Sequence, residues 1–150
     1  MKKLKLYLDN CCFNRPFDDQ SQLLVRLETE AKLFIQEGIK NGTFELVWSY
    51  ILEQENWDNP FECRRQAISP WRLRAKVDIG ESEKVIQIAE TYHQLGLSPK
   101  DSLHVACAIV AKTDFLITTD HRMLKLASEQ LQIVNPIQFI QLYAETKKYD

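Results

Sequence analysis

The chain has 150 residues, 45% of them hydrophobic and 27% charged, with a formal net charge of −2 at pH 7. These values are ordinary for one soluble globular domain covering residues 1–150, and they do not suit a general nucleic-acid binder, which is usually basic. No apolar run is long enough to cross a bilayer, and Met1 leads directly into a strand-like pattern without a signal-peptide core. A cytoplasmic protein without a membrane partner is therefore expected. The four cysteines form no C-x-x-C pair, so we expect reduced thiols and no zinc ribbon.

The first 42 residues predict a strand, a loop and a helix. Residues 4–8 form an apolar run typical of a buried strand, which ends at Asp9 and Asn10. Residues 11–19 mix polar and aromatic side chains and predict an irregular loop. From Ser21 apolar residues recur at three- and four-residue steps, which predicts a helix that ends at Gly38 and the pair Asn41-Gly42.

The middle of the chain predicts a second strand at 44–48, closed by Ser49, which is a good N-cap for the next helix. Asn59-Pro60 ends that helix, and another is predicted over residues 61–68. A short strand is predicted at 77–80.

The remaining elements continue the alternation of strands and helices. A chain of this pattern predicts an α/β fold, with a parallel sheet wrapped by helices. The predicted elements are a helix at 82–95, a nearly apolar helix at 98–110, a strand at 115–118, a short helix at 121–128, a strand at 131–135, a helix from Pro136 to Tyr143, and a frayed charged tail from Glu145 to Asp150.

Several acids lie at the ends of predicted strands or in the first turn of a helix. They are Asp9, Glu53 or Glu55, Asp101 and Asp120. Because the carboxyl ends of parallel strands meet at one edge of a sheet, these acids can converge there. Several carboxylates close together repel one another, and a hard divalent cation with oxygen ligands removes that cost. Mg²⁺ or Mn²⁺ suits such a set.

Each acid also has a purely structural interpretation. Ser98, Pro99 and Asp101 resemble a capping box, which explains Asp101 without any chemistry. Asp120 can cap the short helix that follows it, and Glu53 and Glu55 cannot share one face of a helix because they are two residues apart. His104 lies one turn from Asp101, where a hydrogen-bonded helix histidine is the favoured interpretation.

The order and spacing of these motifs resemble the PIN domain, a nuclease fold found in VapC-type toxins and in many RNA-processing enzymes. The similarity covers nearly the whole chain, up to about the closing helix. The matching segments are Leu6-Tyr7-Leu8-Asp9, the acid that follows Val47-Trp48-Ser49, Asp101 within residues 99–106, and Asp120 within residues 115–120.

The resemblance implies a three-layer α/β/α sandwich with a central parallel sheet and a Mg²⁺- or Mn²⁺-dependent phosphodiesterase that acts on RNA. By position, the catalytic acids are Asp9, Glu55, Asp101 and Asp120, and the metal ligands are Asp9, Asp101 and Asp120. Glu55 suits the family pattern better than Glu53 because of its offset from Ser49. The family commonly has Ser, Thr or Asn one or two residues after the first acid, whereas Cys11 fills the farther of these places here.

The substrate-binding side chains expected from the sequence are amides, a hydroxyl and cations. Thr118 matches the hydroxyl residue two positions before the last acid of the family. The arginines can hold flanking phosphates, and Trp71 can stack on a base, although an ordinary solvated face is the slightly favoured interpretation of the arginines. The candidates are Asn10, Asn14, Arg15, Thr118, Arg64, Arg65, Arg72 and Arg74.

These expectations indicate that the protein is a metal-dependent ribonuclease. A more specific hypothesis is that it is the toxin of a toxin–antitoxin pair. Its partners are then RNA, an antitoxin protein and, as a homodimer, a second copy of the chain. The alternative is a non-catalytic PIN-like module that binds RNA or protein. A haloacid-dehalogenase-like phosphatase is set aside, because that chemistry needs a second Asp at the place occupied by Cys11.

Overall fold

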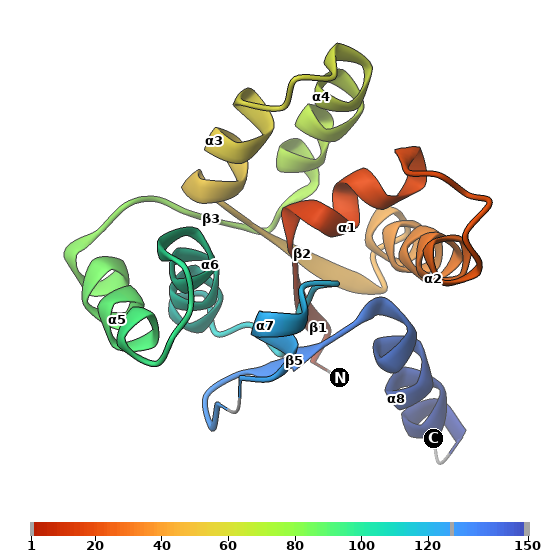
Figure 1. Cartoon of the computed structure of the whole chain (residues 1–150). Helices are drawn as coiled ribbons and strands as arrows, with labels where there is room; N and C mark the ends of the chain where they lie inside the picture. Colours follow the sequence, from red (N-terminus) through yellow and green to blue (C-terminus); the bar gives the residue numbers. More distant parts are fainter. Residues whose placement is uncertain (1, 127, 149–150) are drawn as a thin grey trace.

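Within the residues that the computed structural model describes, 2–126 and 128–148, five short strands form one sheet in the order β3-β2-β1-β4-β5 (Figure 1). Every neighbouring pair is parallel, which confirms the predicted sheet. The side chains of Arg15 and Lys148 lie outside the description. The strands are β1 (Leu4–Leu8), β2 (Phe44–Ser49), β3 (Val77–Ile79), β4 (Phe115–Ile117) and β5 (Gln132–Val134).

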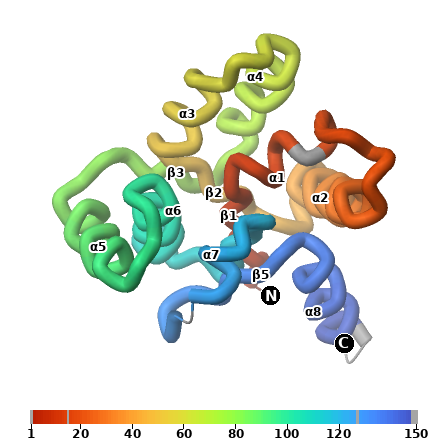
Figure 2. Tube along the Cα trace, in the orientation of Figure 1, coloured from red at the N-terminus to blue at the C-terminus, as the bar shows by residue number. Residues whose placement is uncertain are grey.

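Helices cover both faces of this sheet and give the predicted three-layer α/β/α arrangement. In Figures 1 and 2, α5 and α6 pack together on one side and α2 and α8 on the other, while α3 and α4 extend beyond the sheet. The helices are α1 (Asn10–Asn14), α2 (Leu23–Lys40), α3 (Tyr50–Trp57), α4 (Glu62–Ile68), α5 (Glu83–Gln94), α6 (Pro99–Val110), α7 (His121–Leu124) and α8 (Pro136–Lys148), with 3-10 turns η1 (Arg15–Phe17) and η2 (Ser69–Arg74).

The central position of β1 in the sheet explains its apolar sequence. Leu6, Tyr7 and Leu8 are fully buried because helices cover the sheet on both sides, and such strands read as nearly continuous apolar runs. Leu8 lies opposite Ile117 of β4, and the Asp9 amide donates to the Ile117 carbonyl at 2.9 Å. The residues that follow β1 and β4 therefore meet at the carboxyl edge of the sheet.

The loop predicted over residues 11–19 is wrong over most of its length, because α1 runs to Asn14 and the 3-10 turn η1 follows it to Phe17. The Asp9 carboxylate accepts from the Asn10 amide at 2.8 Å, and the Asp9 carbonyl accepts from the Cys12 amide at 2.9 Å. A helix of five residues is marginal by itself. It is held here by burial of Cys12 and Phe13 in the core, a long-range effect that local propensity does not contain.

Two other predicted boundaries are also wrong. Helix α7 is shorter than predicted and ends at Leu124, while Ala127 lies outside the described residues. Helix α8 continues through most of the predicted frayed tail to Lys148, and Tyr149 and Asp150 lie outside the description.

Helix α2 runs two residues past Gly38, the first of the two signals predicted to end it. A Cβ atom on Gly38 would lie 2.4 Å from Cδ2 of Phe44, so this glycine is needed for close packing of the helix on β2. The helix ends at the second predicted signal, Asn41-Gly42, where Gly42 has a φ of 85°.

Gly38→Ala is expected to lower the free energy of unfolding by about 1–3 kcal/mol, because the added methyl overpacks the Phe44 ring. Urea unfolding of the variant measures this loss. Gly80→Ala is the matched control, because a Cβ at Gly80 meets nothing within 4 Å. Equal stability of the two variants would show that the α2–β2 contact relaxes without cost.

Among the described residues, the helices are all too short or too polar to cross a bilayer.

Candidate active site

The four acids proposed as catalytic from the sequence line one cavity of about 350 Å³. It lies beyond the carboxyl ends of β1, β2 and β4, and Asn10, Cys11 and Thr119 complete its lining. In open α/β sheets this edge is the usual place for ligands. The acids are Asp9, Glu55, Asp101 and Asp120.

Asp9 is the best-anchored acid of the cavity and is only 6% exposed. The hydroxyl of Thr118, which is fully buried, donates to Asp9 Oδ2 at 2.8 Å and accepts from the Asp120 amide at 3.0 Å. Thr118 therefore ties the end of β1 to the loop after β4 and orients Asp9, rather than presenting its hydroxyl to solvent.

Cys11 occupies the place where the family commonly has a small polar residue, and it takes part in the same hydrogen bonds. Its Sγ atom lies 3.5 Å from Asp9 Oδ2 and 3.6 Å from Thr118 Oγ1, and it accepts from the Thr119 amide at 3.3 Å. The thiol is thus a weak substitute for a hydroxyl beside the first acid.

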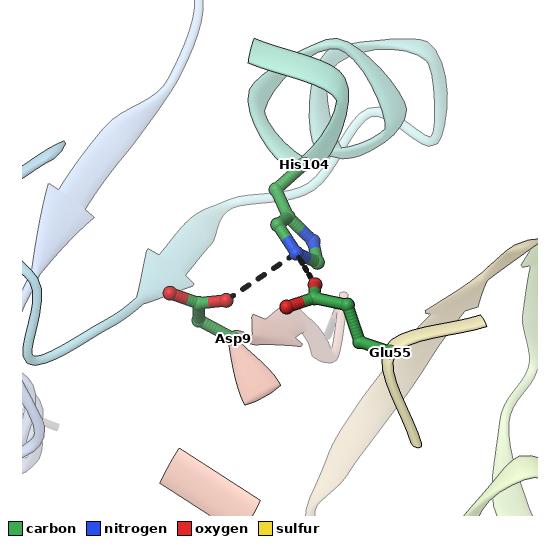
Figure 3. Close-up of side chains that lie close together, drawn as sticks. All are labelled: Asp9, Glu55 and His104. Carbon is green, nitrogen blue, oxygen red and sulfur yellow. Dashed lines mark hydrogen bonds and ion pairs between the residues drawn. The ribbon is translucent and has the colours of Figure 1, made fainter. Parts of the chain in front are cut away.

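The side chains of Glu55 of α3 and His104 of α6 point toward Asp9 (Figure 3). His104 Nε2 contacts Glu55 Oε1 and lies 3.5 Å from Asp9 Oδ1. One ligand atom from each of the three residues lies within 4.8 Å of the others, a spacing that can hold a metal ion. Glu53, the other acid considered, points elsewhere, because it accepts from Trp48 Nε1 at 3.0 Å and pairs with Arg72.

A buried chain of hydrogen bonds holds the other nitrogen of His104. The Tyr7 hydroxyl lies 2.6 Å from His104 Nδ1 and 2.6 Å from Ser49 Oγ. All three side chains are at most 1% exposed. Ser49 also accepts from the Leu52 amide at 3.2 Å and so caps α3, as predicted. The imidazole orientation is thereby fixed from the core, as it is for many histidines beside metal sites.

The sequence favours His104 as a hydrogen-bonded helix histidine, and the structure shows that its partners are Tyr7 and Glu55, beside Asp9, so it joins the acids. Its spacing of three residues from Asp101 was the available signal, because residues three apart on a helix share a face. Burial alone lowers the pKa of His104, but Asp9, Glu55 and Asp101 outweigh it and raise that pKa above the ordinary value of 6.5. The imidazole is thus partly a countercharge for the carboxylates.

Asp101 and Asp120 combine a capping position with a place in the cavity. The Asp101 amide donates to Ser98 Oγ at 3.2 Å, and Asp120 Oδ1 accepts from the amides of Arg122 and Met123 at 2.8 and 3.3 Å. Burial, and then the neighbouring carboxylates of Asp120 and Asp9, raise the pKa of Asp101 above its ordinary 3.8, although Ser98 and His104 oppose this. Several negatively charged carboxylates therefore lie close together here, an arrangement that a bound cation would stabilise.

The donor set suits a divalent cation. The carboxylates of the cavity are hard oxygen ligands, and their mutual repulsion adds to burial in raising the pKa of Asp101. The ligand atoms that lie closest together belong to Asp9, Glu55 and His104, whereas the sequence indicated Asp9, Asp101 and Asp120. The imidazole adds a nitrogen donor to a set expected to contain oxygen alone.

Asp101→Asn is expected to raise the melting temperature of the metal-free protein at pH 7. A carboxyl group whose pKa is raised by folding destabilises the fold once ionised, so the gain should shrink as the pH falls toward 4. The lost helix-capping charge opposes this gain by about 0.3–1 kcal/mol. Thermal unfolding of the wild type and the variant, in EDTA and in Mg²⁺, gives the melting temperatures of the metal-free and metal-bound proteins. A variant that is less stable without metal, yet gains as much from Mg²⁺ as the wild type, would leave Asp101 a helix cap alone.

The predicted arginines are mostly engaged within the protein. Arg64 pairs with Asp18 at 3.2 Å, and Arg65 donates to the Asn59 carbonyl at 2.9 Å. Arg72 pairs with Asp78 at 2.9 Å, while Arg74 is exposed with its guanidinium 5.8 Å from the Trp71 ring centre. The Arg15 side chain lies outside the described part of the chain. Among the predicted arginines whose side chains are described, Arg74 is therefore the one most available for a phosphate.

The predicted stacking role of Trp71 is wrong. Its side chain is only 8% exposed, and its ring packs 6.3 Å from the ring of Phe13, with Lys40 at 5.6 Å. Asn10 and Asn14 do line a cavity next to Glu55, where a substrate can reach them.

Comparison with known proteins supports the fold. No protein-family model matches the sequence, and no curated protein matches it either. The structure is similar to a chain in the crystal structure of VapBC2 from Rickettsia felis bound to a DNA fragment from their promoter, with a TM-score of 0.59 and 15% sequence identity. The match covers 88% of this chain and 98% of that one. Together with the parallel sheet and the acids at its carboxyl edge, this match shows that the chain has the PIN-like fold.

Proposed function

We propose that the protein is a Mg²⁺- or Mn²⁺-dependent endoribonuclease. The observation that carries this proposal is the convergence of Asp9, Glu55, Asp101 and Asp120 on one cavity of a PIN-like fold. Four carboxylates without a cation are costly to hold together, and a phosphodiesterase metal site gives them a function.

In this proposal Asp9, Asp101 and Asp120 hold the cation, with Glu55 and His104 beside it. The bound ion lowers the pKa of a water molecule and stabilises charge on the phosphate. Thr118 keeps Asp9 directed into the site through its 2.8 Å hydrogen bond. Lys100 and Arg122, which line the neighbouring cavity with Asp101 and Asp120, attract the phosphates of the RNA.

Cleavage of a labelled, unstructured RNA in Mg²⁺, in Mn²⁺ and in excess EDTA tests the proposal. Cleavage is expected with either ion and is expected to stop with the chelator, because the proposed mechanism takes its activated water from the bound cation. Equal cleavage in EDTA, with contaminating nucleases excluded, would refute the metal-dependent mechanism. RNA binding without cleavage in any ion would favour the non-catalytic module instead.

We further propose a protein partner, as expected for a toxin paired with an antitoxin. The supporting observation is a run of exposed apolar side chains on the outer face of α2, which single scattered residues do not explain. Copurification with the product of the adjacent gene tests this, and a homodimer of the chain alone would assign the face to self-association. The side chains are Leu23, Leu24, Leu27, Leu33 and Phe34, between 43% and 61% exposed.

A further inference from the structure

A second cavity of about 330 Å³ adjoins the acids. It shares Asn10 and Glu55 with the acid-lined cavity, so a chain bound at the acids can continue directly into it. Asn14, Asn59 and Phe61 form much of its remaining lining. Its chemistry differs from that of the acid-lined cavity, because amides and an aromatic ring replace most of the carboxylates.

Two side-chain amides in this cavity are held in fixed orientations. Asn59 is only 7% exposed, and its Oδ1 accepts from the Phe61 amide at 3.1 Å while its Nδ2 donates to Asn14 Oδ1 at 3.2 Å. Asn14 Nδ2 in turn donates to the Asn10 carbonyl at 3.1 Å. An amide NH₂ has two hydrogens and an amide oxygen accepts two bonds, so each of these groups keeps one unused position. Fixed amides with spare donors and acceptors are the groups that pair with base edges.

Phe61 supplies a flat apolar surface beside the amides. Its side chain is 56% exposed, and the Arg64 guanidinium lies 4.5 Å from the ring centre. Arg64 is itself anchored by Asp18 at 3.2 Å and by the Phe17 carbonyl at 2.9 Å. Arg64 therefore steadies the Phe61 ring, and its charge is already balanced by Asp18.

The charges of this cavity favour a neutral ring over a phosphate. Glu55 and Asp58 line it, and among the described residues of its lining Lys100 is the cation without an ion pair. A phosphate placed deep in the cavity would meet these two carboxylates, whereas a nucleobase would not. Lys100 lines both this cavity and the one next to Asp101, so it can contact the phosphate between them.

We propose that this cavity binds one unstacked nucleobase of the RNA, next to the phosphodiester at the acids. Phe61 stacks on the base, and the Asn14–Asn59 pair contacts its polar edge. Single-stranded RNA is commonly recognised by this combination of stacking and hydrogen bonds. The inference rests on the proposed ribonuclease function and names its substrate more closely, as a single strand with one base turned out of the stack.

The test is a set of fluorescein-labelled single-stranded heptamer RNAs in which each nucleotide in turn is made abasic. Dissociation constants are measured by fluorescence anisotropy in Ca²⁺, and cleavage rates are measured in Mn²⁺. With the wild type, one abasic position is expected to weaken binding roughly tenfold to a hundredfold, because one stacked base is lost. In Phe61→Ala this penalty is expected to disappear, since the variant has no ring to stack on.

The matched control is Trp57→Ala. Trp57 is 79% exposed and lines a different cavity on the other face of α3, so its removal is expected to leave the abasic penalty unchanged. Phe61→Leu keeps the apolar volume but lacks the ring, and it is used if Phe61→Ala does not fold. Asn59→Asp is expected to change which base is preferred while retaining the penalty, because it replaces a donor with an acceptor.

The outcomes separate this inference from the proposed function. A wild type that neither binds nor cleaves RNA would refute the function and this inference with it. A wild type that cleaves RNA, together with an undiminished penalty in Phe61→Ala and Phe61→Leu, would overturn the base cavity alone. Loss of a protein partner in Phe61→Ala, with the RNA penalty retained, would reassign the cavity to protein docking.

Discussion

Asp9→Asn is expected to lower metal-dependent RNA cleavage by at least about a hundredfold and to remove the thermal stabilisation given by Mn²⁺. Loss of an outer partner of a metal site typically costs 10–100-fold, and loss of a direct ligand should cost more. Asp9 lies at the end of the central strand, where Thr118, Asn10 and His104 all contact its carboxylate. Asp9 lines the cavity with Asp101 and Asp120 and also belongs to the close cluster with Glu55 and His104, so its loss removes a ligand from either arrangement.

The control for Asp9→Asn is Glu90→Gln on α5, which removes the same charge from an exposed position. Cleavage rates and melting temperatures with and without Mn²⁺ are measured for both variants. The control is expected to match the wild type. An Asp9→Asn variant that keeps its cleavage rate, or that gains the full stabilisation from Mn²⁺, would remove Asp9 from the metal site.

His104→Ala is expected to lower the free energy of unfolding by about 3 kcal/mol or more, because it breaks a buried charged network by removing one partner. The imidazole contacts Asp9, Glu55 and Tyr7, and it is 1% exposed. Its removal leaves two carboxylates and a hydroxyl without their shared partner. Urea unfolding in EDTA measures the loss, and Tyr7→Phe, which deletes only the hydroxyl, should cost about 1–3 kcal/mol.

The stability lost in His104→Ala is expected to decrease as the pH rises. The pKa of His104 is raised on folding, so the stability from its protonation is fully present below the unfolded value near 6.5 and is lost as the pH rises through the folded pKa. The difference in stability between the wild type and His104→Ala should therefore narrow as the pH increases above 6.5. A difference that stays constant with pH would mean that folding does not shift the pKa of His104.

Much of the architecture could be predicted from the sequence because its signals are local. Apolar runs that end in polar turns gave the strands, and three- and four-residue spacing gave the helices. Ser49 and Ser98 were recognisable as N-caps, and their hydroxyls do accept from Leu52 and Asp101. The parallel order of the strands also follows from the alternation of elements, since connections through helices bring strands back in the same direction.

The contacts and burial of individual side chains were harder to predict, because they depend on residues that are distant in the sequence. Gly38 looks like a helix end by propensity, yet close packing on Phe44 makes it an interior residue of α2. Trp71 looks like a stacking surface, but the core buries it against Phe13. Arginine is a residue type that commonly binds phosphate, and only the fold reveals that Asp18 already pairs with Arg64.

The sequence by itself determined that a set of acids follows the strands of a parallel sheet, and therefore that they meet at one edge. It also determined that Glu53 and Glu55 cannot both enter the same site, because residues two apart lie on different faces of a helix. Only the tertiary structure decided that Glu55 is the one that enters, and that His104 joins it there. The physical reason is that their contacts span 49 positions of the chain between Glu55 and His104 and 97 between His104 and Tyr7. Such contacts depend on the rotation of α3 and α6 against the sheet, which packing of the whole core sets and local sequence does not.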